Sequence, residues 1–396
     1  MKKNREFISV VAMVFICLIL IFIANKMFNN GKERIGKNSL NYEVAKVLSV
    51  TDEKLSRDPI VPNIYIGDQQ IKVEMLTGTY AHQQFDIKNS MSRLYSVYTK
   101  EGMKVIVSYN ISNDNVTNLS VYSYKRNTVV YMLIAIFFAL LIFVGRMKGL
   151  KSVVSIIFSV IVIFYFMLPG ILNGFNPIVL ATISAVMIIL TTLSIIGGLN
   201  SKTFSAILGT ISGVVIAGII SFVAGYFAHL SGLTAENTES LIVLAENTKF
   251  NMNGLMYAAI LIASLGAIMD IGVSIVSAIF EIHATNPKLD RKQLFNSGMN
   301  VGKDIIGTMA NTLILAFVGS SLTLLIIIAA TNMPYIQMSN LDIVCTEIVQ
   351  GIAGSIAIVI AVPITAFISV LFIDNNKTKL KGNKRKVKNK GAVIKN

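Results

Sequence analysis

Long apolar runs separated by short polar loops make up most of this chain. A helix that crosses a lipid bilayer needs about 20 predominantly apolar residues. Eight runs meet this requirement, at residues 7–24, 128–144, 152–168, 177–197, 204–228, 254–280, 305–330 and 343–373. The last run contains Pro363, which is expected to kink its helix or to end the regular part. The pattern therefore predicts an all-α polytopic membrane bundle with eight transmembrane helices.

Residues 26–127, between the first two runs, follow a different pattern. Apolar and polar residues alternate in three stretches, at 71–75, 104–109 and 119–124. Glycines such as Gly67 and Gly102 lie between these stretches. Alternation with a period of two, bounded by turn residues, is typical of strands with one buried face. About five or six short strands in this length predict a small β-rich domain, for which an OB-like barrel is the candidate architecture.

The composition is that of a membrane protein and excludes an ordinary soluble one. Of the 396 residues, 54% are hydrophobic and 14% are charged, whereas charged residues make up about 25% of a typical soluble domain. The net charge is +14, and much of it lies in alternate short loops and in the tail. Because Lys and Arg accumulate in cytoplasmic loops, both termini are expected inside and residues 26–127 outside. The acidic loop 229–253, with Glu236, Glu239 and Glu246, is expected on the outer side as well.

These patterns divide the chain into four parts: an N-terminal membrane anchor at 1–25, an extracytoplasmic β-rich domain at 26–127, a seven-helix transmembrane domain at 128–373 and a basic cytoplasmic tail at 374–396. The first run is either a retained anchor or a cleaved signal peptide. The missing A-x-A pattern after it favours the anchor. The tail is expected to contact anionic lipid, and nucleic acid is not expected as a partner because the tail lacks interleaved aromatic residues.

Two of the apolar runs are polar along one edge only. The first carries Asp270, Ser274, Ser277 and Glu281, and the second carries Asp304, Thr308 and Asn311. Spacings of three, four and seven keep such residues on one face of a helix. A carboxylate at the centre of a transmembrane helix costs about 2.5–3.5 kcal/mol on insertion scales, which makes Asp270 a candidate functional residue.

The expected geometry of this pair follows from helix dimensions. Asp270 lies 16 residues into its run, or about 24 Å along the axis. Residues 296–303, with two glycines, are interpreted as a re-entrant or helix-entry turn that leads into Asp304, so that Asp304 begins the second helix at the rim. Asn311 would then lie about 10 Å deeper, near the level of Asp270. Glu281 and Asp304 would form the cytoplasmic mouth of a polar path.

Two interpretations of these polar edges remain open. A carboxylate held away from water retains its proton and releases it when wetted, and the neighbouring hydroxyls and amide make an oxygen-rich site for a small cation. The alternative is that Asp270 and Asn311 share a hydrogen bond that only holds two helices together. Because ionisable residues inside membranes are commonly functional, the first interpretation is favoured.

Other motifs receive structural interpretations. The run at 204–228 places small residues at every fourth position, including Gly209, Gly213 and Gly225, which is typical of tight helix packing. Glu347, near the outer end of the last run, is interpreted either as part of an outer vestibule or as an interfacial residue. The two cysteines and three scattered histidines indicate neither a disulfide framework nor a zinc site, and no cofactor or metal is expected.

Two long stretches carry a family resemblance. The stretch 266–282, GAIMDIGVSIVSAIFEI, and the stretch 297–319, SGMNVGKDIIGTMANTLILAFVG, resemble the signature segments of the YibE/F-like family of bacterial multipass membrane proteins. The resemblance covers roughly residues 128–373, and the anchor with its outer domain is similar to the longer, YibE-type members. It implies a location in the bacterial cytoplasmic membrane and, as a partner, a shorter member of the same family. It implies no substrate.

The resulting hypothesis is a membrane transporter or permease of unknown substrate, whose polar path is centred on Asp270. A homo-oligomer is the other partner considered. The alternative is a non-transporting scaffold or receptor that acts through residues 26–127. An intramembrane aspartic protease using Asp270 and Asp304 is disfavoured, because two such carboxylates must lie within about 3 Å and the expected depths differ by roughly 15 Å. No enzymatic activity is therefore expected.

Overall fold

The computed structural model describes residues 2–29, 40–112, 115–230, 241–243 and 254–392. The chain divides into two compact units, one formed by residues 32–140 and the other by residues 1–31 together with 141–396. The predicted acidic loop residues Glu236, Glu239 and Glu246 lie outside the described part, and so do the side chains of the basic tail from residue 374 onward.

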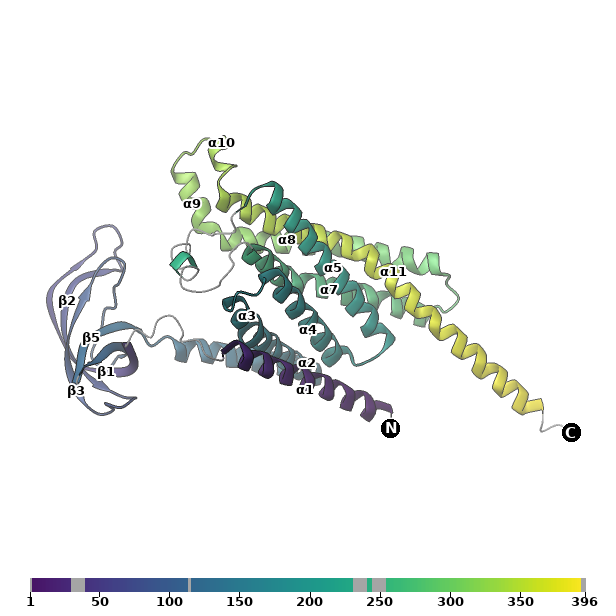
Figure 1. Ribbon diagram of the computed structural model, residues 1–396, viewed down its shortest axis with the longest axis horizontal. Helices are drawn as coiled ribbons and strands as arrows, with labels where there is room; N and C mark the ends of the chain where they lie inside the picture. Colours follow the sequence, from purple (N-terminus) through teal and green to yellow (C-terminus); the bar gives the residue numbers. More distant parts are fainter. Residues whose placement is uncertain (1, 30–39, 113–114, 231–240, 244–253, 393–396) are drawn as a thin grey trace. The chain divides into compact units, whose positions relative to one another are not determined.

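The smaller unit contains one antiparallel sheet of five strands in the order β3-β2-β1-β4-β5. The strands are β1 (Leu40–Arg57), β2 (Tyr65–Met75), β3 (Gln84–Met91), β4 (Lys104–Ser112) and β5 (Asn115–Tyr124), visible in Figure 1. The two edge strands β3 and β5 contact each other without a hydrogen-bonded ladder. The sheet therefore curls into a half-barrel.

The alternating pattern fixes which face of this sheet is buried. Ile71, Val73 and Met75 of β2 are inside, and so are Val105 and Val107 of β4. The predicted β-rich domain and its alternation are thus confirmed. The half-barrel does not by itself establish the predicted OB-like architecture.

A buried polar cluster also ties two strands of the half-barrel to the segment that precedes β4. The side-chain oxygen of Gln69 accepts hydrogen bonds from the Thr99 amide and hydroxyl, each at 3.0 Å, and from the Asn89 amide at 3.2 Å. The Asn89 amide also donates to the Val97 carbonyl at 2.8 Å. The cluster thereby fixes residues 97–99 against β2 and β3.

The larger unit is helical (Figure 1). Its elements are α1 (Lys2–Asn29), α2 (Asn127–Val162, which belongs to the smaller unit as far as Leu140), a π-helical turn (Ile163–Met167), α3 (Leu168–Leu172), α4 (Pro177–Gly197), α5 (Ser201–Phe227), α7 (Leu255–Thr285), α8 (Arg291–Ser320), α9 (Leu322–Ala330), α10 (Tyr335–Met338) and α11 (Asp342–Ala392). Pro363 lies inside α11, which continues past it, so the proline does not end the helix.

Six helices within the described residues are long and apolar enough to cross a membrane, and the apolar part of α1, Val14–Phe28, is shorter. The predicted count of eight is not confirmed. Two of the predicted runs lie in the single stretch Asn127–Leu172, and Arg146 within it has a non-helical backbone (φ 47°, ψ −126°). A Cβ on Gly149 would collide with the Leu141 carbonyl, although residues eight apart in a straight helix are about 12 Å apart. The chain therefore turns back at the basic loop that was predicted there.

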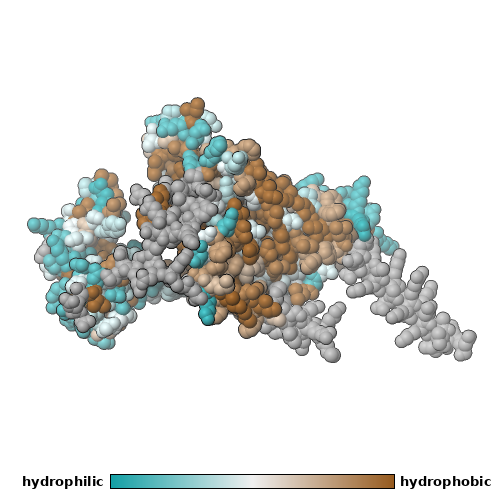
Figure 2. Space-filling model, in the orientation of Figure 1, coloured by the Kyte–Doolittle hydropathy of each residue, from teal (hydrophilic) through white to brown (hydrophobic). Residues whose placement is uncertain are grey.

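The core of this unit is formed by α4, α5, α7 and α11. Four isoleucines of α7, Ile268, Ile271, Ile275 and Ile279, are fully buried in it. Elsewhere the bundle exposes bulky apolar side chains, for instance along α2 and α5. Figure 2 shows these apolar side chains as a broad brown surface over the helices. Such a surface suits contact with lipid.

Small residues of α5 allow its neighbours to approach closely. A Cβ on Gly209 would collide with the Thr365 side chain of α11, and one on Gly213 would stand 2.7 Å from Ile268 and 3.0 Å from Ala361. A Cβ on Gly225 would collide with the side chain of Tyr257 of α7. These contacts follow the packing interpretation of the small-residue spacing, because α5 meets both α7 and α11 along this edge.

Candidate functional site

The polar edge of α7 faces away from the helical core. Asp270, Ser274 and Glu281 are exposed and Ser277 is half-buried, whereas the isoleucines on the opposite side of the helix are fully buried. The predicted stripe is therefore a single edge of the helix, but it points outward. Toward the other end of α7 the same edge continues with Ala259, Ala263 and Gly266, all exposed. It thus combines small residues with an acid, where a lipid-facing edge would carry bulky apolar side chains.

The polar residues of α8 are exposed as well. Asp304, Thr308 and Asn311 all lie on the outer side of this helix. The Thr308 hydroxyl donates to the Ile305 carbonyl at 2.9 Å, so it is satisfied within its own helix. The side chain of Asn311 has no hydrogen-bond partner among the described residues.

The start of α8 differs from the sequence prediction. The helix begins at Arg291, and Asp290 caps it: its carboxylate accepts from the Gln293 amide at 2.7 Å while the Gln293 side chain accepts from the Asp290 amide at 3.0 Å. Residues 296–303 are therefore helical rather than a turn, and Asp304 lies about 20 Å from the helix start. The two glycines that suggested a turn are packing positions.

The contacts between α7, α8 and α11 define how the polar edges are aligned. A Cβ on Gly298 would collide with Ile279, and Leu313 and Ser264 both lie against Gly354 of α11. One antiparallel register satisfies both pairs, and it places Gly307 at the level of Asp270.

This register corrects two expected depths. Asp304 lies only about 5 Å from the level of Asp270 along the axis, instead of roughly 15 Å, and Asn311 lies about 6 Å beyond that level on the other side. Asp270 has no hydrogen bond or ion pair within the described residues, so the two helices are not joined by a bond between Asp270 and Asn311. Packing of α8 against α7 and α11 holds them together instead.

Glu347 lies at a cavity of about 330 Å³ between α8, α9 and α11. Its walls are almost entirely apolar, with Phe317, Leu325 and Ile348 among the lining residues. One carboxylate oxygen of Glu347 and the hydroxyl of Ser321 are buried there without a hydrogen-bond partner in the described part of the chain. Asp270 borders neither this cavity nor the two other cavities described below.

Comparison with known families identifies the chain. The family model for YibE/F-like protein matches residues 133–375, and the model for the YibE/F family N-terminal domain matches residues 39–124. The chain belongs to the YibE/F-like family. No curated protein and no solved structure matches it significantly.

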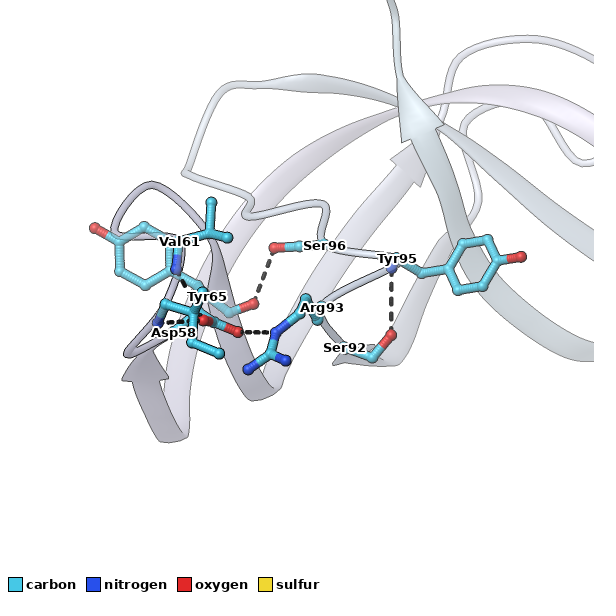
Figure 3. A network of polar contacts seen from close by, with 8 residues as sticks. Asp58, Val61, Tyr65, Ser92, Arg93, Tyr95 and Ser96 are labelled. Atoms are coloured by element: carbon cyan, nitrogen blue, oxygen red, sulfur yellow. Dashed lines mark hydrogen bonds and ion pairs between the residues drawn. The ribbon is translucent and has the colours of Figure 1, made fainter. Parts of the chain in front are cut away.

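The YibE/F N-terminal domain carries a feature that the sequence did not reveal. Asp58 is buried after β1, and one of its oxygens accepts from Arg93 at 2.6 Å. The other oxygen accepts from the amides of Ile60 and Val61 at 2.7 and 2.9 Å (Figure 3). The hydrogen bond from Arg93 is the main reason that the pKa of Asp58 falls to about 2, and the two amides lower it further against the opposing effect of burial.

This network holds two loops of the YibE/F N-terminal domain beside each other. They present Ile60, Leu94 and Tyr95, which are 71%, 87% and 78% exposed. The Ser92 hydroxyl accepts from the Tyr95 amide at 3.2 Å, and the Ser96 hydroxyl donates to the Tyr65 carbonyl at 2.9 Å, which fixes the second loop (Figure 3). An Asp-Pro pair at 58–59 was the available signal for an ordered turn.

The two polar edges offer few ligands for a cation. Among the described residues, no three His, Cys, Asp or Glu side chains lie close enough to hold a metal ion together. On α7, Asp270 has hydroxyls one and two turns away in Ser274 and Ser277, and the α8 edge adds Thr308 at nearly the same level. The edges thus offer one carboxylate and several neutral oxygens.

Proposed function

We propose that this YibE/F-like protein is a membrane transporter whose polar path runs along the outward edges of α7 and α8, with Asp270 as its ion-binding or proton-carrying carboxylate. The supporting observation is that Asp270 is exposed and unpaired on a helix of membrane-spanning length. A charged carboxylate facing lipid at mid-membrane costs about 2.5–3.5 kcal/mol, a cost that water or a protein partner in front of it would remove.

The location of the polar edges bears on the assembly. Since they lie on the outside of one chain, the path proposed here is closed by a second subunit, either another copy or a shorter member of the family. Gly266 and Gly307 support this, because no atom of the described residues lies within 4 Å of a Cβ placed on either of them. A helix of a neighbouring subunit can therefore approach α7 and α8 closely at the level of Asp270. The proposal assigns no bond-breaking chemistry to the chain.

The distribution of basic residues favours the bacterial cytoplasmic membrane with both termini inside, the half-barrel outside and the tail on anionic lipid. The strand order and the approach of β3 to β5 favour an OB-like barrel that is open along this seam.

Reconstitution tests the transport role. The purified chain in liposomes is screened for ion- or proton-coupled currents against a panel of small solutes, and Asp270→Asn is then compared with the unchanged chain. Loss of at least about tenfold in flux, or loss of its pH dependence, is expected because the variant cannot change its charge. Asp86→Asn, on an exposed strand position, is the matched control. Unchanged flux and pH dependence in Asp270→Asn would refute the role.

A scaffold or receptor role is the second candidate, and the exposed apolar residues of the outer domain favour it. Ile60, Leu94 and Tyr95 are held in place by the Asp58 network and are available to a partner. Under this alternative, the double variant Leu94→Asp with Tyr95→Ser abolishes the cellular phenotype of the protein while Asp270→Asn leaves it intact. The reverse pattern favours transport.

A further inference from the structure

A second cavity lies where α4 ends and α5 begins, at the end of the bundle that is predicted to be cytoplasmic. Its volume is about 350 Å³, within the usual range for small-molecule sites. Residues from four parts of the chain line it, among them Lys148 after the break in α2, Ile196 and Gly197 of α4, Lys202 and Thr203 of α5, and Ser277 of α7. Its polar groups are thus two ammonium groups and two hydroxyls.

The basic groups around this cavity have no acidic partner. Within the described residues, neither Lys148 nor Lys202 forms an ion pair. A third lysine, Lys151, donates to the carbonyl of Ile196, which also lines the cavity, at 3.5 Å. The α7 carboxylates on either side of these lining residues, Asp270 before Val273 and Glu281 after Ser277, do not line the cavity. The surroundings therefore carry an uncompensated positive charge.

The hydroxyl of a largely buried residue, Thr203, faces the same space. Thr203 is only 6% exposed, and its hydroxyl has no hydrogen-bond partner among the described residues. A Cβ on Gly197 would stand 2.5 Å from this hydroxyl oxygen, so the hydroxyl lies directly over Gly197. Thr203 also borders a neighbouring hollow, but Gly197 lines only the cavity with the two lysines. The hydroxyl is therefore placed toward the basic cavity.

The local backbone suits an anion as well. Gly198 has a φ of +75°, a conformation that glycine adopts readily, and it carries the chain into the first turn of α5. Asn200 caps that helix by accepting from the Thr203 amide at 2.9 Å. The amides of Ser201 and Lys202 have no hydrogen bond within the described residues. Free amides at a helix N-terminus favour negative charge.

We propose that this cavity binds a phosphate group through Lys148, Lys202 and the Thr203 hydroxyl. Lysine pairs as a point charge with a phosphate, and the hydroxyl and the amides of the first α5 turn donate hydrogen bonds to its oxygens. The phosphate belongs either to an anionic lipid headgroup or to a free phosphate-bearing solute. This inference does not depend on the transport proposal, since it concerns binding and neither Asp270 nor α8 contributes to the cavity.

Binding to the full chain in nanodiscs tests the proposal. One arm uses phosphatidylcholine discs and titrates inorganic phosphate by calorimetry. The other uses mixed phosphatidylcholine and phosphatidylglycerol, and measures the phosphatidylglycerol that is retained with the protein. Lys148→Gln with Lys202→Gln is expected to weaken binding at least tenfold, and Thr203→Val to weaken it less. Lys288→Gln with Lys292→Gln, two exposed lysines of the same predicted side, is the matched control.

The arms separate the two sources. Saturable binding of inorganic phosphate that depends on Lys148 and Lys202 supports the site with a free solute, whereas retention of phosphatidylglycerol with the same dependence supports a lipid headgroup. Both variants replace exposed lysines, so equal thermal unfolding midpoints are expected, and Thr203→Val gives an independent measure if they differ. Absence of binding in both arms, or an equal loss in the control, overturns the proposal.

Discussion

Asp58 and Asp270 are carboxylates in opposite surroundings. Asp58 is buried, and every one of its oxygens has a donor in Arg93, Ile60 or Val61. Asp270 is exposed on α7 without any partner in the described chain. Satisfied buried charges support a local conformation, whereas an unpaired carboxylate on a membrane helix needs a different explanation. The first residue is therefore a structural one, and the second is the one for which we propose a role in transport.

The stability of the half-barrel should depend on pH through Asp58. Its pKa is about 2 in the folded domain against an ordinary value of 3.8. Because the pKa of Asp58 is lower in the folded domain, its ionised carboxylate adds to the free energy of unfolding. This contribution is complete above about pH 4 and is lost as the pH falls toward 2. Urea unfolding of residues 39–127 at pH 6, 4, 3 and 2 measures this loss.

The variant Asp58→Asn is expected to unfold at a lower urea concentration at pH 6 and to remove this part of the pH dependence. Glu101→Gln, at an exposed turn position, serves as the control and should behave like the unchanged domain. An Asp58→Asn domain that keeps the same acid dependence would contradict the assignment to this residue.

At the scale of helices, close approach to α5 is the main feature of the core. Gly213→Ala is expected to destabilise the bundle by about 1–3 kcal/mol, because the added methyl meets Ala361, whose short side chain cannot move away. Gly307→Ala is the matched control, since a Cβ there meets nothing within 4 Å, and alanine favours a helix by up to about 1 kcal/mol over glycine. Unfolding of the purified chain in detergent compares the two. Equal stabilities would show that the α5 contact is not tight.

Sequence periodicity predicted some of these elements and missed others for a physical reason. The alternation around Ile71 and Val105 marks strands because one face of the sheet is buried. The polar edge of α7 was likewise evident from spacing. The start of α8 was missed because glycine has a low helix propensity, while the contacts of Gly298 with Ile279 and of Gly302 with Val362 favour the helix only once the bundle has formed. The cavity between Lys148 and Lys202 joins residues 54 positions apart, which no local pattern indicates.

At the scale of the whole molecule, the charge distribution predicts which parts lie on each side of the membrane. A chain with Cys17 and Cys345 replaced by alanine receives a single cysteine at Ser92 in the half-barrel or at Thr285 at the end of α7. A membrane-impermeant maleimide is expected to label Ser92→Cys in intact cells and Thr285→Cys only after the cells are opened, because the loop after α7 is rich in Lys and Arg. Labelling of both in intact cells would contradict the predicted orientation.

Gly266 and Gly307 have a consequence for how this protein tolerates change. A Cβ at either position meets no atom of the described residues within 4 Å, so the packing of a single subunit does not require glycine there. Helix propensity in a single subunit even favours alanine over glycine at both positions. Under the proposed assembly, the need for two glycines comes from a second subunit, whose helix packs against them beside Asp270.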